Sequence, residues 1–259
     1  FFQPISSHIC QINTQNVTAT TVPSDFPSNC GVKRNDTVTE ISADGTKTTR
    51  TYNTVQCNLV GLNNGAGQTL RVVTNDTSRL KLHFPNEGKV ITINGSIEHC
   101  DYVAGSTTCQ DSPSIVSNPL LRFSLLGCPN PVGGNGCDDN PAATITNSTS
   151  KLDTQEITVQ GNSSIIGLPY FMYMPIADLT VNGGGGTPLS LAGVFWVNTI
   201  KGSGNVEIAV PGSGIGDILN QYSGGSGGSD DDNEESTAAP PILEFTLRAV
   251  QRFFFGQGA

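Results

Sequence analysis

The chain has 259 residues, a formal net charge of −9 at pH 7 and only 14% charged residues, which is about half the usual charged share. A net negative charge repels phosphate backbones and anionic lipid, so the composition argues against nucleic acid and bare membrane as partners. Thr favours strands, Gly, Asn and Ser favour turns, and long runs of strong helix formers are nearly absent. The sequence therefore predicts an all-β fold of short strands joined by tight turns.

Residues 1–127 are interpreted as a β-rich N-terminal region with hairpins. Thr37–Ile41 and Thr48–Val55 have the composition of two strands, and an Ala-Asp-Gly-Thr turn signal at residues 43–46 lies between them. Alternating apolar residues predict several more short strands further along this region. Leu120–Leu126 is expected to be its last apolar strand.

A loop rich in Cys, Gly and Pro at residues 128–141 marks the expected domain or subdomain boundary. After it, residues 142–222 hold strand-like segments spaced by roughly 10–15 residues, several of which end in Gly or Asn-Gly, and this pattern is typical of stacked rungs that bury a shared core. An antiparallel β-sandwich is the alternative, because it also needs regularly spaced short strands. The segments are 143–146, 156–159, 170–174, 178–181, 194–197 and 206–210.

The last part of the chain combines a linker with an apolar segment. Gly214–Tyr222 predicts one short helix that caps the last rung, and the acidic, Gly/Ser-rich residues 223–241 predict a flexible linker. Residues 242–259 form an apolar C-terminal segment, which is either a final core element or an assembly element donated as a strand to a neighbouring subunit. The assembly candidates are Leu243, Phe245, Leu247, Val250, Phe253, Phe254 and Phe255.

One segment, residues 168–222, resembles a known family. It reads LPYFMYMPIADLTVNGGGG from Leu168, LAGVFWVNTI from Leu191 and GNVEIAVP from Gly204. This pattern of aromatic, apolar and Gly residues is similar to the C-terminal β-helical region of pilus-assembly and minor pseudopilin-like proteins of type IV pilus systems. The resemblance implies a short right-handed β-helix on the extracellular side. The chain starts at Phe1 without Met, so we expect that a leader was removed or that the sequence is a fragment.

The cysteines suggest disulfides and not metal binding. Cys100/Cys109 and Cys128/Cys137 each enclose eight residues, which predicts two local disulfides and an oxidising, extracellular or cell-surface compartment. Cys30 is expected to pair with Cys57 or with Cys10; unpaired, buried thiols are the alternative. Because no CxxC motif occurs and the chain has only 3 His, we expect no metal site and no cofactor.

Six N-x-S/T triplets are candidate glycosylation sites, and we expect them in solvated turns. They lie at Asn16, Asn35, Asn75, Asn94, Asn147 and Asn162.

No catalytic constellation stands out. The three histidines, His8, His83 and His99, lack a Gly-x-Ser-x-Gly context, so structural roles are favoured over a Ser-His-Asp triad. Glycoside chemistry needs two carboxylates that converge in a cleft, and the rung region offers Glu156, Asp178 and Glu207 as candidates. Three aromatic residues, Tyr170, Tyr173 and Trp196, could stack on sugars, with core burial as the alternative.

The sequence thus favours a non-enzymatic extracellular structural or assembly protein, pseudopilin-like or a filament subunit. Its expected partners are copies of itself or other surface or pilus subunits. A carbohydrate-binding surface adhesin, with glycans as partners, is the alternative, and a polysaccharide lyase or hydrolase on a β-helix is less favoured. We expect no transmembrane segment, because the longest apolar run, Leu189–Val197, is too short to span a bilayer.

Overall fold

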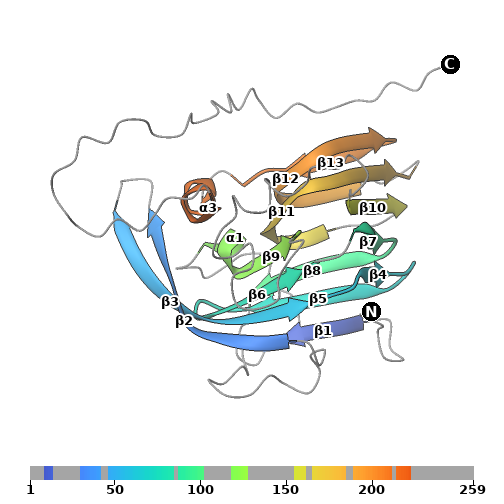
Figure 1. The fold of residues 1–259 in the computed structure, drawn as a ribbon. Helices are drawn as coiled ribbons and strands as arrows, with labels where there is room; N and C mark the ends of the chain where they lie inside the picture. Colours follow the sequence, from blue (N-terminus) through green and yellow to red (C-terminus); the bar gives the residue numbers. More distant parts are fainter. Residues whose placement is uncertain are drawn as a thin grey trace.

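The computed structural model describes residues 9–13, 30–41, 46–84, 87–101, 118–127, 155–161, 165–184, 189–211 and 214–222. These ranges are mostly strand with two short helices, so the expected all-β class is confirmed (Figure 1). The elements are β1 (Ile9–Asn13), β2 (Cys30–Ile41), β3 (Lys47–Asn58), β4 (Leu62–Asn64), β5 (Thr69–Thr74), β6 (Ser78–His83), β7 (Gly88–Ile93), β8 (Ser96–Asp101), α1 (Pro119–Arg122), β9 (Phe123–Leu126), β10 (Gln155–Gly161), β11 (Ile165–Gly183), β12 (Leu189–Ser203), β13 (Val206–Ala209) and α3 (Ile215–Tyr222).

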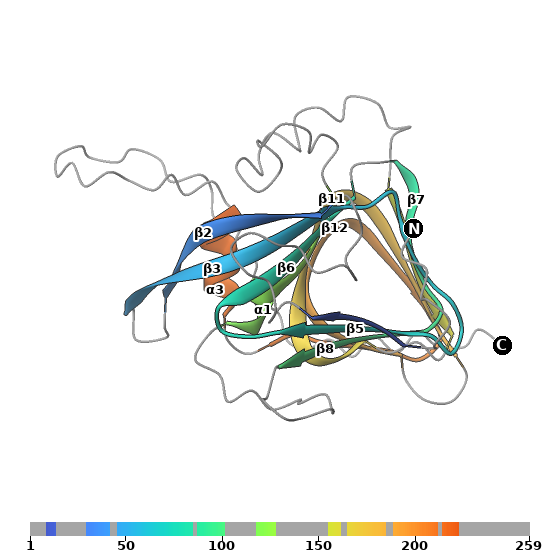
Figure 2. The same cartoon turned by 90° about the horizontal axis from the view of Figure 1, so that it is seen from below.

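The strands wind into a three-sided coil, whose triangular outline is visible in Figure 2. Face A stacks β1, β5, β8, the first parts of β11 and β12, and β13. Face B stacks the second half of β3, then β6, β9 and the middle parts of β11 and β12. Face C stacks β4, β7, β10 and the last parts of β11 and β12. The chain passes along faces B, C and A in turn, and each circuit adds one rung.

The direction of pairing decides between the two expected architectures. Among the named strands of the described ranges, every pairing is parallel except β2 with β3. The antiparallel β-sandwich, which was the alternative, does not fit these registers. The antiparallel β2–β3 pair is the predicted hairpin, with longer strands than the sequence signals suggested.

Strand pairing continues across the loop at residues 128–141. Before this loop lie β9 and β7, and after it lie their partners β11 and β10. The stack also begins far upstream of the expected start at residue 142, because β1 pairs with β5 on face A and Asn53 of β3 pairs with Ser78 of β6 on face B. The chain leaves β9 on face B and enters β10 on face C within one circuit, so the strands on both sides of the expected boundary share one stack and one core.

Alternating side chains fill the coil. On face C the inward positions form a column of Leu62, Ile91, Ile157 and Leu179, which are in register from one rung to the next. Each of them is at most 3% exposed, and burying such a side chain contributes roughly 1.5–3 kcal/mol. The repeated column explains why the rungs stack in this register, since a shift by one residue would turn every apolar side chain outward.

A second, smaller core lies on the outer surface of face B. Phe171 and Tyr173 of β11 point out of the coil and pack with Leu121 of α1, Ile218 of α3 and Val38 of the hairpin. The two helices and the hairpin thus cover one side of face B (Figure 2).

Two local expectations in this region need correction. Leu120–Leu126 is not one strand: a helical turn comes first, because the Asn118 side chain accepts a hydrogen bond from the Leu120 amide at 3.0 Å and Pro119 starts the turn. Gly214–Tyr222 does hold a helix, but α3 packs against α1 and β2 instead of capping the last rung. Asn118 also donates to Asp217 of α3 at 2.9 Å, which ties the two helices together.

Glycines let the corners of successive rungs approach closely. A Cβ on Gly95, between faces C and A, would lie 2.0 Å from the carbonyl oxygen of Gln68 in the rung below. A Cβ on Gly183, at the same corner two rungs higher, would lie 2.2 Å from the carbonyl oxygen of Asn205. Because these neighbours are backbone atoms, a side chain cannot be accommodated without separating the rungs.

We therefore predict that Gly95→Ala lowers the free energy of unfolding by several kcal/mol, about the cost of overpacking a core. Gly216→Ala is the matched control, because a Cβ there meets nothing within 4 Å and Ala in a helix gains about 0.5–1 kcal/mol. Urea unfolding followed by circular dichroism measures both. Equal stabilities of the two variants would contradict the corner-packing explanation.

Candidate functional site

The outer surface of face C carries a five-residue repeat. Its copies are Ile-Thr-Ile-Asn-Gly from Ile91, Ile-Thr-Val-Gln-Gly from Ile157 and Leu-Thr-Val-Asn-Gly from Leu179. The first and third residues point into the coil and the second and fourth point out. Sequence reasoning noted that strands ended in Gly or Asn-Gly but missed this repeat, and aligning the three segments would have found it.

The repeat builds two parallel rows of uncharged side chains. Thr92, Thr158 and Thr180 are partners in successive strands and are partly exposed. Gln160 pairs with Asn182, and Asn94 follows the last paired residue of β7, beside Gln160. We call Asn94, Gln160 and Asn182 the amide column, and neighbouring rungs place its members about 4.8 Å apart.

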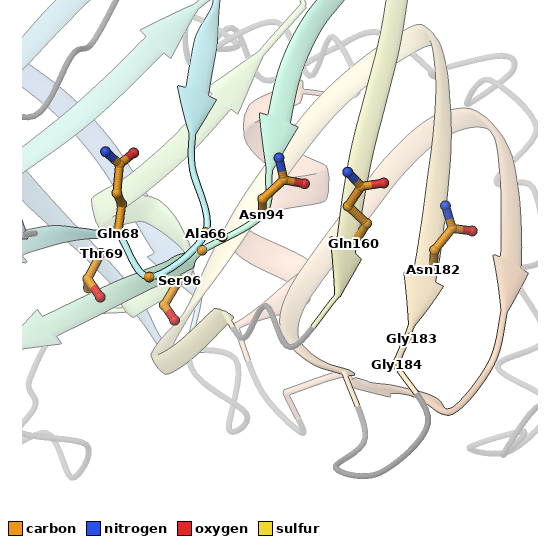
Figure 3. Close-up of a pocket in the computed structure, with 11 residues that line it drawn as sticks. Ala66, Gln68, Thr69, Asn94, Ser96, Gln160, Asn182, Gly183 and Gly184 are labelled. Atoms are coloured by element: carbon orange, nitrogen blue, oxygen red, sulfur yellow. The ribbon is translucent and has the colours of Figure 1, made fainter.

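The amide column borders a groove of about 760 Å³ at the corner between faces C and A. Figure 3 shows the three amide groups side by side on neighbouring strands, with Gln68 and Ser96 at the opposite end of the row. Every described residue that lines the groove is uncharged, and none of them is aromatic; they are Ala66, Gly67, Gln68, Thr69, Asn94, Gly95, Ser96, Gln160, Asn182, Gly183 and Gly184.

Hydrogen bonds fix parts of this groove and leave others unpaired. The Ser203 hydroxyl donates to Asn182 Oδ1 at 2.8 Å and continues the column onto β12. The Gly65 amide donates to Gln68 Oε1 at 2.7 Å. Asn94 Oδ1 is buried and has no hydrogen-bond partner among the described residues. A buried acceptor without a partner costs about 1–3 kcal/mol, which marks Asn94 as a candidate ligand contact.

The three carboxylates considered for catalysis do not converge. Glu156 and Asp178 are partners on the outer surface of face C, whereas Glu207 lies in β13 on face A. Asp178 accepts hydrogen bonds from Thr199 Oγ1 at 2.6 Å and Asn198 Nδ2 at 3.2 Å. Neither Glu156 nor Asp178 lines the groove. The pair therefore lies on an open sheet surface, without the enclosing cleft that glycoside chemistry uses.

Buried charges join the hairpin to the coil. Asp36 of β2 accepts hydrogen bonds from Arg79 of β6 and from Thr54 Oγ1, the latter at 2.7 Å. Arg79 is fully buried and also lies over the ring of Tyr52, 5.2 Å from its centre. Burial alone would raise the pKa of Asp36, but the charges of Arg79 and Lys81 outweigh this effect and hold the pKa at about 2. The carboxylate therefore stays ionised and paired.

A second polar network explains His99. Arg122 Nε donates to Thr74 Oγ1 at 3.1 Å, and Thr74 Oγ1 lies 2.9 Å from His99 Nε2. His99 Nδ1 lies 3.2 Å from the carbonyl oxygen of Pro169, which can only accept, so Nδ1 carries the proton and Nε2 accepts from Thr74. Burial and the nearby Arg122 charge, which is paired with Asp101, lower the pKa of His99 to about 3. His99 is a neutral structural residue, in agreement with the sequence expectation.

The aromatic residues considered for sugar stacking belong to the cores. Tyr170 lies inside the coil between Phe123 and Phe195, with ring centres 5.6 and 5.5 Å away. Tyr173 is 1% exposed and packs edge-on against Trp196, which is partly buried. Core burial, the alternative weighed from the sequence, is therefore correct for both tyrosines, and they offer no exposed stacking surface.

The cysteine expectations are met in part. Cys30 and Cys57 form a disulfide with an S–S distance of 2.02 Å across the β2–β3 pair, which decides against pairing of Cys30 with Cys10. Cys100 is also disulfide-bonded. Cys109, Cys128 and Cys137 lie outside the described residues, so the two local pairs stay predictions.

Several other predicted sites lie wholly or partly outside the described ranges. Asn16, Asn147, Asn162 and the assembly candidates Leu243 to Phe255 are among them, as is His8. Asn75 lies at a turn, where its Oδ1 accepts from the Thr77 amide at 2.9 Å. Asn94 belongs to the groove instead of a fully solvated turn. Within the described part of the chain, no group of His, Cys, Asp and Glu residues could hold a metal ion.

Comparison of the chain with protein-family models, curated proteins and solved structures finds no match. The helices among the described residues are too short and too polar to cross a membrane. The function of the groove therefore has to be inferred from its own chemistry.

The His99 network predicts a pH-dependent stability. The folded protein binds a proton at His99 more weakly than the unfolded chain, whose His titrates near 6.5. Stability from this residue is fully present above pH 6.5 and is lost as the pH falls towards 3, by up to about 1.4 kcal/mol per pH unit. Urea unfolding between pH 7.5 and 4.5 measures this slope.

His99→Gln is the matching variant, because its amide can donate to Pro169 and accept from Thr74 but does not titrate. We expect a flatter slope for this variant over the same pH range, whatever its absolute stability. The same slope in both proteins would show that His99 does not carry the effect.

Proposed function

We propose that the protein is a non-enzymatic extracellular structural protein of the cell surface, which acts by assembling with copies of itself or with other surface or pilus-type subunits. The observation that carries this proposal is the open end of the coil at β12 and β13. Support for the compartment comes from the Cys30–Cys57 disulfide, since disulfides persist in oxidising environments.

The last rung exposes residues that would be core residues in any earlier rung. Ile200 is in register with Leu179 and so continues the buried column of face C, but it is 51% exposed whereas Leu179 is 1% exposed. Val210, just after β13, is 48% exposed. In the described ranges, β13 pairs with β12 alone, so its other edge is open. Stacked folds need such an end to be covered, and open edges accept further strands.

The occupant that fits this end is the apolar segment Leu243–Phe255 of a neighbouring copy. Leu243, Phe245 and Leu247 alternate as in a strand, so one face can pack on Ile200 while the backbone pairs with the open edge. The preceding linker, residues 223–241, is long enough to reach beyond its own subunit, at up to about 3.3–3.6 Å per extended residue. The similarity to pilus-type β-helical regions is consistent with this mode of assembly.

We predict that the intact chain forms concentration-dependent oligomers and that a chain ending at Gly227 stays monomeric. Ile200→Lys in the intact chain should weaken assembly at least tenfold, because a charge would be buried at the contact. Val60→Lys is the matched control, since Val60 is 61% exposed at a loop distant from this edge. Sedimentation velocity over a range of protein concentrations measures all four proteins.

Two results would contradict assembly through this end. One is equal oligomer size for the intact and shortened chains. The other is a shortened chain that unfolds more easily while both chains remain monomeric, which would show that the segment covers the end of its own coil.

A further inference from the structure

The groove along the amide column suits a ligand that the assembly function does not require. The described residues of its lining include no charged side chain that would select phosphates, carboxylates or amines. They also include no aromatic or large aliphatic side chain, which apolar small-molecule sites use. Its volume of about 760 Å³ lies within the range of about 300–1,000 Å³ that is usual for ligand sites. A neutral, hydroxyl-rich ligand is the class that remains.

Primary amides are well matched to hydroxyl groups, because each amide offers two donors and one carbonyl acceptor and each hydroxyl both donates and accepts. Ser203 already donates to Asn182 Oδ1, so Asn182 would offer its NH₂ group to a ligand as a donor. Asn94 Oδ1 is buried and has no hydrogen-bond partner among the described residues, so rotation of this amide towards the groove would supply the complementary acceptor without breaking a bond that the oxygen already makes. A ligand hydroxyl that donates to Asn94 would remove the cost of this unpaired oxygen.

The repeat of the column indicates an extended polymer. Asn94, Gln160, Asn182 and Ser203 lie on successive rungs, so the row is about 14 Å long at about 4.8 Å per rung. The row runs along the coil axis, and Thr92, Thr158 and Thr180 form a second row beside it. Evenly spaced polar groups, three of them amides, favour a ligand whose own groups repeat along its length.

The net charge of the protein narrows the class of ligand further. A net charge of −9 repels polyanions at long range, and no cationic side chain is present among the described residues of the groove to offset this repulsion. We propose that the amide column is a binding site for a neutral polysaccharide, which lies along the corner groove and hydrogen-bonds to Asn94, Gln160 and Asn182. This inference is independent of the assembly proposed above, since the groove runs along the side of the coil.

A purely structural role for the amides is the competing explanation, because ladders of Asn or Gln also stabilise stacked strands. The corner itself is held by other groups: Gly95 and Gly183 provide the close backbone approach, and the Asn205 carbonyl accepts from the Leu189 amide at 2.9 Å. Substitutions that keep the size of the amides while changing their hydrogen bonding can therefore separate binding from folding.

The test uses the full chain and soluble neutral polysaccharides, namely a β-glucan, a mannan and a galactan, with polygalacturonate as the charged comparison. Affinity electrophoresis and titration calorimetry measure binding. We expect saturable binding to at least one neutral polymer, and a loss of at least tenfold in the double variant Gln160→Glu with Asn182→Asp. Asn63→Ala is the matched control, because Asn63 is exposed on the same face but does not line the groove, and it should bind as the unmodified protein does.

Thermal unfolding of each variant distinguishes a loss of binding from a loss of folding. The proposal requires that the double variant remains folded at the assay temperature and loses binding, and a smaller substitution, Asn182→Ser, should weaken binding in the same direction if the double variant is unstable. Absence of binding to all three neutral polymers, preference for polygalacturonate, or undiminished binding by folded groove variants would each overturn it.

Discussion

The in-register stacking of buried aliphatic side chains from rung to rung is the constraint on which the rest of the structure depends. Leu62, Ile91, Ile157 and Leu179 form one continuous column because their strands are parallel and aligned. The outward residues of the same strands then have to align as well, since side chains alternate with a period of two. The threonine row and the amide column are thus consequences of the register that the core requires, and their chemistry is free to serve binding.

Buried charges appear where this regular stack has to hold irregular elements. Arg79 and Arg122 are fully buried, and each is paired with a carboxylate, Asp36 in the hairpin and Asp101 at the end of β8. A buried pair adds little net stability over apolar residues, but losing one partner costs about 3–5 kcal/mol. The Arg79–Asp36 pair therefore penalises any other placement of the hairpin on the coil, and the Arg122–Asp101 pair does the same for α1. Thr54 and Thr74 hydrogen-bond to these arginines and complete both networks.

The sequence predicted local structure better than the extent of the stack. The hairpin, the helix at Gly214–Tyr222 and most strands of the rung region follow from turn residues and apolar alternation, which act over a few neighbours. The joining of β9 to β11 across residues 128–141 could not be predicted in this way, because parallel partners come from successive circuits and insertions hide their spacing. The buried partners of His99 lie on three other elements, so no local pattern indicates them.

The candidate site, too, is only partly predictable from the sequence. Its signal, the repeat that contains Thr92, Thr158 and Thr180, is present in the sequence, but its meaning depends on the parallel register that places the three copies side by side. The chemistry of Tyr170 and Tyr173 alone suggested sugar binding, but both side chains are buried in the cores. Burial, which the sequence alone does not give, decides between an aromatic platform and a core residue.

The open end and the groove occupy different surfaces of the coil. Assembly through the last rung adds material along the axis, where Ile200 and Val210 are exposed. The amide column runs parallel to that axis and ends at Ser203 on the last rung itself. Copies held together through the last rung would present several grooves, and a polymer bound to more than one of them would gain affinity through multivalency, without any new contact within each site. Assembly and polysaccharide binding would therefore reinforce each other, although each proposal rests on separate residues.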